Sequence, residues 1–298
     1  MKPFAYEAPT SVDEAVALLA GKGERARPLA GGTDILVQLR QGRFDLDLLV
    51  DLKRIPELLR VTYDSAEGLT VGAAVTCAVL SEHSAVREAY PGLIDAASII
   101  GGTAIQGRAT LGGNLCNAAP SGDSISAMMV LGGEAIVAGP RGRRQVPVSA
   151  FCTAPGKTVL ERGELVVALK FPAPQSHTGA CYLRFIPRGE MDIAVAGAGA
   201  WVALNETHTR IEDARIALAA VGPTPIDAAA AAASLIGQPP SEAPYETAAA
   251  LAAEAATPIE DTRGTVAQRR HLVGVLVTRA LRGAVERAVG KHQPEEEA

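Results

Sequence analysis

Two short glycine-rich segments constrain this chain more than any other feature of its sequence. The first is L-A-G-G-T-D, from Leu29 to Asp34, and the second is T-L-G-G-N-L-C-N-A-A-P-S-G-D, from Thr110 to Asp123. Glycine in a regular element costs roughly 0.5–1 kcal/mol relative to alanine, so a Gly-Gly pair marks a sharp turn or a close approach of the backbone to something else. The fold has to offset this cost at both places.

The composition is that of an ordinary globular protein. The chain has 298 residues, of which 48% are hydrophobic and 20% charged, which is enough for two domains and a sizeable core. A formal charge of −5 argues against nucleic acid or an anionic membrane as the main partner. We see no signal peptide and no apolar run of eighteen residues, and therefore expect a cytoplasmic protein.

The cysteines and histidines give no metal-binding pattern. Cys77, Cys116, Cys152 and Cys181 are scattered along the chain without any C-x-x-C spacing, and the five histidines are equally dispersed. Structural zinc and iron–sulfur sites need clustered thiolates or imidazoles. We therefore expect this chain to bind no metal on its own.

The hydrophobic pattern predicts a small α/β unit at the N-terminus. Ser11, with Glu14 three residues later, forms a capping box and predicts a helix that ends at Gly21. A strand at 27–30, a helix at 34–40 and a strand at 46–52 follow. Further along, we expect a strand at 69–71, short helices over 77–100, a helix at 124–131, a hairpin over 134–148 and a strand at 164–171.

A domain boundary is predicted at Pro172-Ala173-Pro174. The expected domains are residues 1–176 and 177–290, followed by an acidic tail at 291–298. Behind the boundary come three strand candidates and then alanine-rich helices. The strands are expected at 181–186, 193–204 and 210–220, and the helices at 227–236, 245–256 and 265–289.

The glycine pairs at 31–32 and 112–113 favour an anion site. Each has a hydroxyl residue and a polar side chain beside it, and backbone N–H groups exposed by glycine turns bind anions without any net positive charge. A diphosphate in an acidic protein fits this pattern, with simple tight turns as the alternative. No P-loop is present, and the G-A-G-A-W-V run that starts at Gly197 lacks the last glycine and the following helix of a dinucleotide fingerprint.

Asp123 indicates what lies beyond the diphosphate. A carboxylate next to phosphate would be repelled, so we expect it to face neutral hydroxyls such as those of a ribityl chain. The alternative, which does not exclude this role, is that Asp123 caps the helix that follows.

Four segments together resemble a known family. A30-G-G-T-D34, T110 to D123, R184-F-I-P-R-G-E-M-D-I-A194 and R263-G-T-V-A-Q-R-R-H-L272 are similar, in order, to the FAD-binding medium subunit of molybdenum hydroxylases of the xanthine dehydrogenase and carbon monoxide dehydrogenase type. The resemblance covers nearly the whole chain. It implies an α+β protein, with a vanillyl-alcohol oxidase or PCMH-type FAD-binding domain of two α/β subdomains. A smaller α+β domain would follow, with a three-stranded antiparallel sheet plus helices.

The resemblance also implies a set of FAD-binding residues. Residues 29–35 and 110–114 would hold the pyrophosphate through backbone N–H groups, Arg184 would lie near the flavin, and Ile193 would lie close to its ring. The full set is Leu29, Ala30, Gly31, Gly32, Thr33, Asp34, Ile35, Ile100, Gly101, Thr110, Gly112, Gly113, Asn114, Asn117, Asp123, Val166, Arg184 and Ile193. No catalytic residue or metal ligand is implied on this chain.

The sequence departs from the family pattern at two positions. Gln268 stands where a tyrosine is common, which leaves the packing role of that position open. Ile193 stands where carbon monoxide dehydrogenase subunits often have an aromatic residue, which favours kinship with the xanthine dehydrogenase side.

The implied function is electron transfer within a larger enzyme, of which this chain would be the FAD-dependent oxidoreductase subunit. Substrate would be hydroxylated on a large molybdopterin-binding subunit, and electrons would pass through the [2Fe–2S] clusters of a small subunit to FAD on this chain and then to an external acceptor. The assembly would be a dimer of heterotrimers. Two alternatives remain: a stand-alone FAD-dependent oxidase with the same cofactor domain, or a non-enzymatic nucleotide-binding scaffold.

Overall fold

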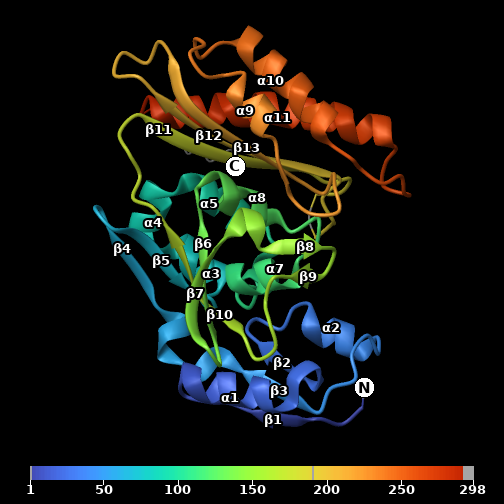
Figure 1. Cartoon of the computed structure of the whole chain (residues 1–298). Helices are drawn as coiled ribbons and strands as arrows, with labels where there is room; N and C mark the ends of the chain where they lie inside the picture. Colours follow the sequence, from blue (N-terminus) through green and yellow to red (C-terminus); the bar gives the residue numbers. More distant parts are fainter. Residues whose placement is uncertain (1, 190, 291–298) are drawn as a thin grey trace.

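Three main β-sheets, each with helices of its own, follow one another from the bottom to the top of Figure 1. The computed structural model describes residues 2–189 and 191–290. The predicted acidic tail at 291–298 lies outside the described residues. Among the helices described, none is both long enough and apolar enough to cross a membrane.

The N-terminal unit is built on three parallel strands in the order β1-β3-β2. Ser11 caps the first helix as predicted, because its hydroxyl accepts a hydrogen bond from the Glu14 N–H at 3.2 Å. The short strand β1 was not predicted, since three residues carry no periodic signal. The elements are β1 (Ala5–Glu7), α1 (Val12–Lys22), β2 (Ala26–Leu29), α2 (Ile35–Arg40) and β3 (Leu48–Asp51), with 3₁₀ turns at Gly23–Arg25, Leu52–Arg54 and Pro56–Leu59.

The middle unit has a five-stranded antiparallel sheet in the order β4-β5-β10-β6-β7. Its central strand β10 (Leu165–Phe171) is buried along almost its whole length, as expected for a strand with neighbours on both sides. The predicted hairpin is confirmed as β6 (Glu134–Gly139) and β7 (Gly142–Pro147). On the other side of β10 lie β5 (Gly68–Gly72) and the edge strand β4 (Val61–Asp64), and a small ladder joins β8 (Cys152–Ala154) to β9 (Lys157–Thr158).

Short helices accompany this sheet, and those over 77–100 and near 124–131 were predicted, whereas those at 103–106 and 111–117 were not. They are α3 (Cys77–Glu82), α4 (Ser84–Ala89), α5 (Pro91–Ala97), α6 (Thr103–Gln106), α7 (Leu111–Asn117) and α8 (Asp123–Val130), with a 3₁₀ turn at Val148–Ala150. The turn expected at the second glycine pair is instead the first turn of α7. Thr110 caps that helix, because its hydroxyl accepts a hydrogen bond from the Gly113 N–H at 2.9 Å.

The C-terminal unit has four antiparallel strands rather than the three expected. β11 (Thr178–Phe185), β12 (Ala196–Leu204) and β13 (Ile211–Ala219) were predicted within a few residues, but β14 (Ile226–Asp227) was missed. Because β14 pairs with β13, the helix predicted from 227 is shortened to α9 (Ala229–Ala233). The strand predicted from 193 begins only at Ala196, since the Ile193 N–H bonds the Asp192 side chain at 2.8 Å instead of joining the ladder.

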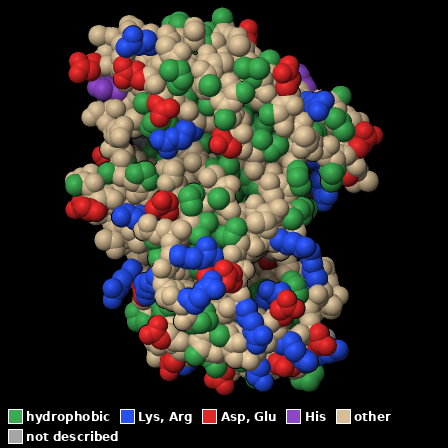
Figure 2. All heavy atoms as spheres, viewed as in Figure 1, with side chains coloured by type: hydrophobic (Ala, Val, Ile, Leu, Met, Phe, Trp, Pro, Cys, Tyr) green, Lys and Arg blue, Asp and Glu red, His purple; other side chains and the backbone are tan. Residues whose placement is uncertain are grey.

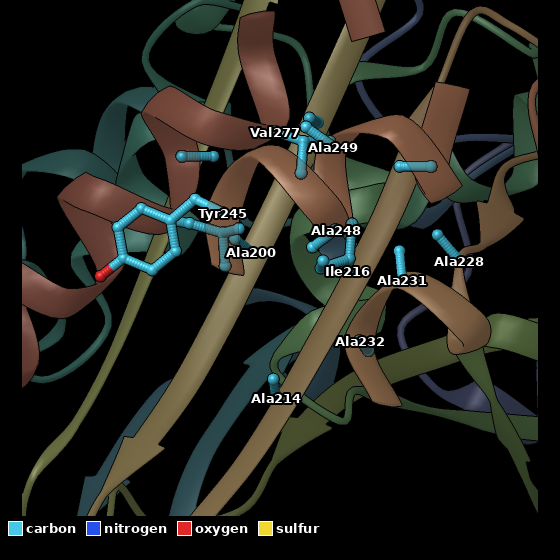
Figure 3. Packing of buried hydrophobic residues seen from close by; sticks show 14 of the residues in the cluster. Ala200, Ala214, Ile216, Ala228, Ala231, Ala232, Tyr245, Ala248, Ala249 and Val277 are labelled. Carbon is cyan, nitrogen blue, oxygen red and sulfur yellow. The ribbon is translucent and has the colours of Figure 1, made fainter. Parts of the chain in front are cut away.

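Alanine allows helices to lie very close to this sheet. α11 (Val266–Ala288) packs on β11 and β12, and α10 (Glu242–Ala255) packs on α11. Figure 3 shows Ala248 of α10 beside Ile216 and Ala249 beside Val277 of α11. The closest approach is at Gly179, where an added Cβ would lie 2.1 Å from the carbonyl oxygen of Ala284.

The other face of the same sheet packs on the middle unit. α5 and α8 lie against it, so the sheet is sandwiched between two layers of helices (Figure 1). Arg287, from the last turn of α11, reaches across the edge strand β11 and pairs with Asp95 on α5 at 2.6 and 2.8 Å. This bidentate ion pair joins the C-terminal unit to the middle unit.

Candidate FAD-binding cleft

The two glycine segments meet in one cleft between the N-terminal and middle units. The cleft has a volume of about 720 Å³, and residues 30–35, 109–120 and 155–166 contribute most of its walls. Small-molecule and cofactor sites typically enclose roughly 300–1,000 Å³, so a ligand of substantial size fits here. Figure 2 shows a hollow on this face, with Lys and Arg side chains gathered on the lower part of the molecule beside it.

The first glycine segment is held in place by a buried ion pair. Lys53 pairs with Asp51 at 2.6 Å and donates a hydrogen bond to the carbonyl oxygen of Ala30 at 3.1 Å. Burial of Asp51 raises the pKa of its carboxyl group, but hydrogen bonds from Lys53 and Tyr6 outweigh this effect. The pKa of Asp51 is therefore below its usual value. The ionised carboxylate and Lys53 therefore fix the backbone where β2 passes into the loop.

This loop lines the cleft and has backbone donors without a backbone partner. Gly32 has a φ of +88°, which favours glycine over any residue with a Cβ. In the described part of the chain, the N–H groups of Gly32, Thr33 and Asp34 donate no backbone hydrogen bond. Three consecutive donors on one concave loop can receive phosphate oxygens without a net positive charge.

Two of the predicted glycines bring backbones together. A Cβ added to Gly31 would lie 2.1 Å from the carbonyl oxygen of Arg108, and one added to Gly112 would lie 2.6 Å from that of Ala73. Glycine at these positions lets the first segment dock on the second, and the second dock on the middle sheet. Gly113 is more open, with only the Thr110 hydroxyl within 4 Å of an added Cβ.

Neutral amides link the two sides of the cleft. Gln38 on α2 donates a hydrogen bond to the side-chain oxygen of Asn117 on α7 at 3.1 Å. Asn114 accepts one from the Ser124 hydroxyl at 2.8 Å, which fixes the orientation of its amide. Burial raises the pKa of Asp34, and the Asn117 amide opposes that shift.

Arginines that the sequence analysis did not single out also line the cleft. The guanidinium of Arg27 lies 4.9 Å from the ring centre of Phe44, and its Nε is buried with no partner in the described structure. Arg43 and Arg162 line the cleft as well. A polar atom left unpaired in a ligand-sized cleft is suited to a ligand acceptor. The only sequence signal was the position of Arg27, just before the glycine loop.

Asp123 lies outside the lining of the cleft, at the start of α8. Its carboxylate pairs with Arg184 on β11 at 2.5 Å and accepts a hydrogen bond from the Tyr182 hydroxyl at 3.3 Å. Burial raises the pKa of Asp123 to about 6, and the Arg184 guanidinium opposes that shift. The helix-cap alternative is wrong, because the N-cap of α8 is Gly122 and Asp123 is the first helical residue.

Most of the predicted binding residues come together, and five do not line the cleft. Leu29 is buried in a small apolar cluster below the loop, and Ile193 is 49% exposed. Gly101 adjoins Ile100, which does line the cleft, while Asp123 and Arg184 form the ion pair described above. The predicted residues that line it are Ala30, Gly31, Gly32, Thr33, Asp34, Ile35, Ile100, Thr110, Gly112, Gly113, Asn114, Asn117 and Val166.

The cleft offers binding groups rather than catalytic ones. Within the described residues, no three His, Cys, Asp or Glu side chains come close enough together to hold a metal ion. Cys116 lines the cleft, but burial raises the pKa of its thiol to about 12, so it is not a thiolate nucleophile. Free loop N–H groups, the unpaired Nε of Arg27 and neutral amides instead fit the diphosphate and hydroxyl groups of FAD.

Comparison with known families agrees with this arrangement. The model described as "FAD binding domain in molybdopterin dehydrogenase" matches residues 2–174. The model described as "CO dehydrogenase flavoprotein C-terminal domain" matches residues 181–284. Together they cover nearly all of the chain.

Individual relatives are similar over almost their full length. The xanthine dehydrogenase FAD-binding subunit of Escherichia coli O157:H7 is 32% identical, with 97% of this chain and 98% of the relative covered. The carbon monoxide dehydrogenase medium chain of Hydrogenophaga pseudoflava is also 32% identical, with 94% and 96% covered.

Solved structures show the same fold. A chain of reconstituted CO dehydrogenase from Oligotropha carboxidovorans superposes with a TM-score of 0.91 at 30% identity, covering 96% of this chain and 99% of that one. A chain of quinoline 2-oxidoreductase from Pseudomonas putida 86 gives 0.88 at 31% identity, with 97% and 99% covered. The resemblance seen in the sequence is confirmed: this chain belongs to the FAD-binding medium subunits of the molybdenum hydroxylases, oxidoreductases of the xanthine dehydrogenase and carbon monoxide dehydrogenase type.

Proposed function

We propose that this chain is the electron-transfer subunit of a heterotrimeric molybdenum hydroxylase, and that its cleft holds FAD. The observation that carries the proposal is the loop at Gly32, Thr33 and Asp34, which lines a cleft of cofactor size and whose N–H groups donate no backbone hydrogen bond in the described structure. The family membership of the whole chain supports it. In this proposal the FAD-binding domain comprises residues 1–176 and the C-terminal domain residues 177–290, in line with the matched ranges 2–174 and 181–284.

Each part of the cleft then has a role in binding. The loop at 32–34 and the first turn of α7 hold the pyrophosphate, with Arg27 supplying positive charge. Asn114 and Asn117 supply neutral partners for hydroxyl groups. The segment 119–120 also lines the cleft and is tied to the C-terminal domain, because the Ala220 N–H donates to the carbonyl oxygen of Pro120 at 2.7 Å.

The residues beyond this segment belong to the flavin end in the proposal. Asp123 follows Pro120 by one short turn, and its pairing with Arg184 ties β11 to α8 there. Because Asp123 compensates the guanidinium charge, Arg184 acts as part of an ion pair and not as an isolated cation. Ile193 is exposed on the loop that follows β11, where it can contact the ring or a partner subunit.

Bound FAD supplies the electron-accepting chemistry, and this chain supplies its position and its electrostatic surroundings. Electrons come in the proposal from [2Fe–2S] clusters on a small subunit, after substrate oxidation at a molybdopterin centre on a large subunit. Two relatives are named as a subunit and a medium chain, which supports a multisubunit enzyme. We further propose a dimer of heterotrimers.

Copurification with and without partners tests this proposal. The chain expressed alone should bind FAD but should not oxidise purines, aldehydes or N-heterocycles. Co-expression with the two partner subunits should give one complex that contains FAD, molybdenum and iron. An isolated chain that oxidises an organic substrate would instead support the stand-alone oxidase, and a chain that binds no flavin would support the scaffold.

A further inference from the structure

A second cavity lies where the middle and C-terminal units meet. Its volume is about 510 Å³, again within the range of roughly 300–1,000 Å³ that ligand sites enclose. It shares no lining residue with the FAD-binding cleft. Junctions between domains are a preferred place for such sites.

The cavity exists because helices cover only part of the C-terminal sheet. On the face toward the middle unit, α8 packs on Gly199, where an added Cβ would lie 3.0 Å from the carbonyl oxygen of Ser126. Side chains alternate along a strand, so Trp201, two residues further along β12, points to the same face. It lies beyond the end of α8 and lines the cavity, together with Arg215, its register partner on β13.

Three aromatic residues line the cavity. The guanidinium carbon of Arg215 lies 4.1 Å from the ring centre of Trp201, a cation–π arrangement that holds the two side chains together. Tyr63 of β4 and Tyr90 also line the cavity, and their ring centres are 6.0 Å apart in an edge-to-face pair. Tyr90 is fixed by its hydroxyl, which donates to the carbonyl oxygen of Pro172 at 2.9 Å.

The charges are arranged asymmetrically. Of the two lining arginines, Arg287 is compensated by its bidentate pair with Asp95. Arg215 donates one hydrogen bond to the carbonyl oxygen of Val130 at 3.0 Å, while its nearest carboxylate, on Asp213, lies 3.9 Å away and is 57% exposed. Arg215 therefore keeps unused donors in a half-buried, aromatic setting. Glu88 also lines the cavity, and its carboxylate disfavours an anionic group near itself.

From this geometry we propose that the cavity binds a small planar aromatic carboxylate. The ring contacts Tyr63 and Trp201, and the carboxylate receives the free N–H groups of Arg215. Arginine suits this task, because its planar fork can stack on an aromatic face and donate two parallel hydrogen bonds to a carboxylate. The proposal is independent of the electron-transfer function.

Trp201 makes the proposal directly testable, since it is the only tryptophan of the chain. The full chain with FAD is titrated with benzoate while tryptophan fluorescence is recorded, and binding is repeated by calorimetry. Benzyl alcohol lacks the charge and cyclohexanecarboxylate lacks the aromatic ring, so both should bind about tenfold more weakly, the equivalent of ~1.4 kcal/mol. These ligand controls need no variant.

Arg215→Gln should weaken benzoate binding about tenfold or more. Arg210→Gln is the matched control, because Arg210 lies just before β13, outside the cavity, with only an exposed pair to Glu212. It should bind like the wild type. Unchanged binding in Arg215→Gln, equal binding of benzyl alcohol, or displacement of FAD by benzoate would overturn the proposal. The proposal would also be overturned if benzoate did not bind and the cavity were protected from hydrogen exchange in the assembled complex. That result would identify the cavity as a contact site for a partner subunit.

Discussion

Gly31 packs directly against the carbonyl oxygen of Arg108, so closely that a Cβ on Gly31 would lie 2.1 Å from that oxygen. The contact joins the first glycine segment to the backbone just before the second segment, which is far away in sequence. The loop that follows Gly31 can present its N–H groups to the cleft only while this approach is kept. The glycine pair is therefore required for assembly of the site as well as for access to it.

Gly31→Ala should consequently release FAD. The added methyl group would overlap with a backbone oxygen, so the loop must move. This movement displaces the three N–H groups of residues 32–34. We expect FAD affinity to fall about tenfold or more, which corresponds to ~1.4 kcal/mol. Equilibrium dialysis against FAD measures this. Gly21→Ala is the control, because no atom lies within 4 Å of its added Cβ, and it should bind FAD normally. Equal affinity of both variants would contradict a docked loop.

Lys53→Met tests the support beneath the same loop. Asp51 is only 7% exposed, and loss of Lys53 leaves its carboxylate without a cation and the Ala30 carbonyl without a donor. We expect the free energy of unfolding to fall by about 1–3 kcal/mol and FAD to bind more weakly. Urea unfolding of the apoprotein separates the two effects. Lys22→Met, at an exposed position of α1, should change neither, and a wild-type stability for Lys53→Met would show that the buried pair contributes nothing.

The Asp123–Arg184 pair predicts a pH dependence. Burial raises the pKa of Asp123 from 3.8 to about 6 in the folded chain. A carboxyl group with a higher pKa in the folded chain than in the unfolded chain binds its proton more tightly in the folded chain. It therefore stabilises the fold at pH values below the unfolded pKa, and this contribution is lost as the pH rises through about 6. Between pH 4 and pH 7 the wild type should therefore lose stability relative to Asp123→Asn, by an amount on the order of 3 kcal/mol for a shift of about two units. Unfolding free energies at several pH values measure it. A difference that stays constant over this range would mean that Asp123 is not shifted.

Local patterns in the sequence predicted the elements well. The capping box at Ser11, the hairpin around Gly139 to Gly142 and the long C-terminal helix α11 all depend on neighbouring residues, and the structure confirms them. Strands β1 and β14 were missed because two or three residues carry no periodicity. They exist only because another strand lies beside them.

The sequence predicted most residues of the site but not the contacts between them. The glycine pairs indicated unusual backbone, but that Gly31 contacts Arg108 depends on the packing of two separate units. The ion-pair partner of Asp123 could not be predicted from the sequence either, since Arg184 comes from the C-terminal sheet. Arg27 and Phe44 were missed because a cation beside an aromatic residue is common on any surface, and only the fold turns this pair toward the cleft.

Reduction of the flavin by substrate tests the central claim most directly. The three-subunit complex and the isolated FAD-loaded chain are each mixed with an oxidisable substrate of the complex in the absence of oxygen, and the visible absorbance of the flavin is followed. We predict that the flavin absorbance bleaches in the complex, together with reduction of the iron–sulfur clusters, and stays unchanged in the isolated chain, because in the proposed function this chain positions FAD while the substrate is oxidised on the large subunit. Bleaching by substrate in the isolated chain would contradict the account and identify the protein as a self-sufficient oxidase.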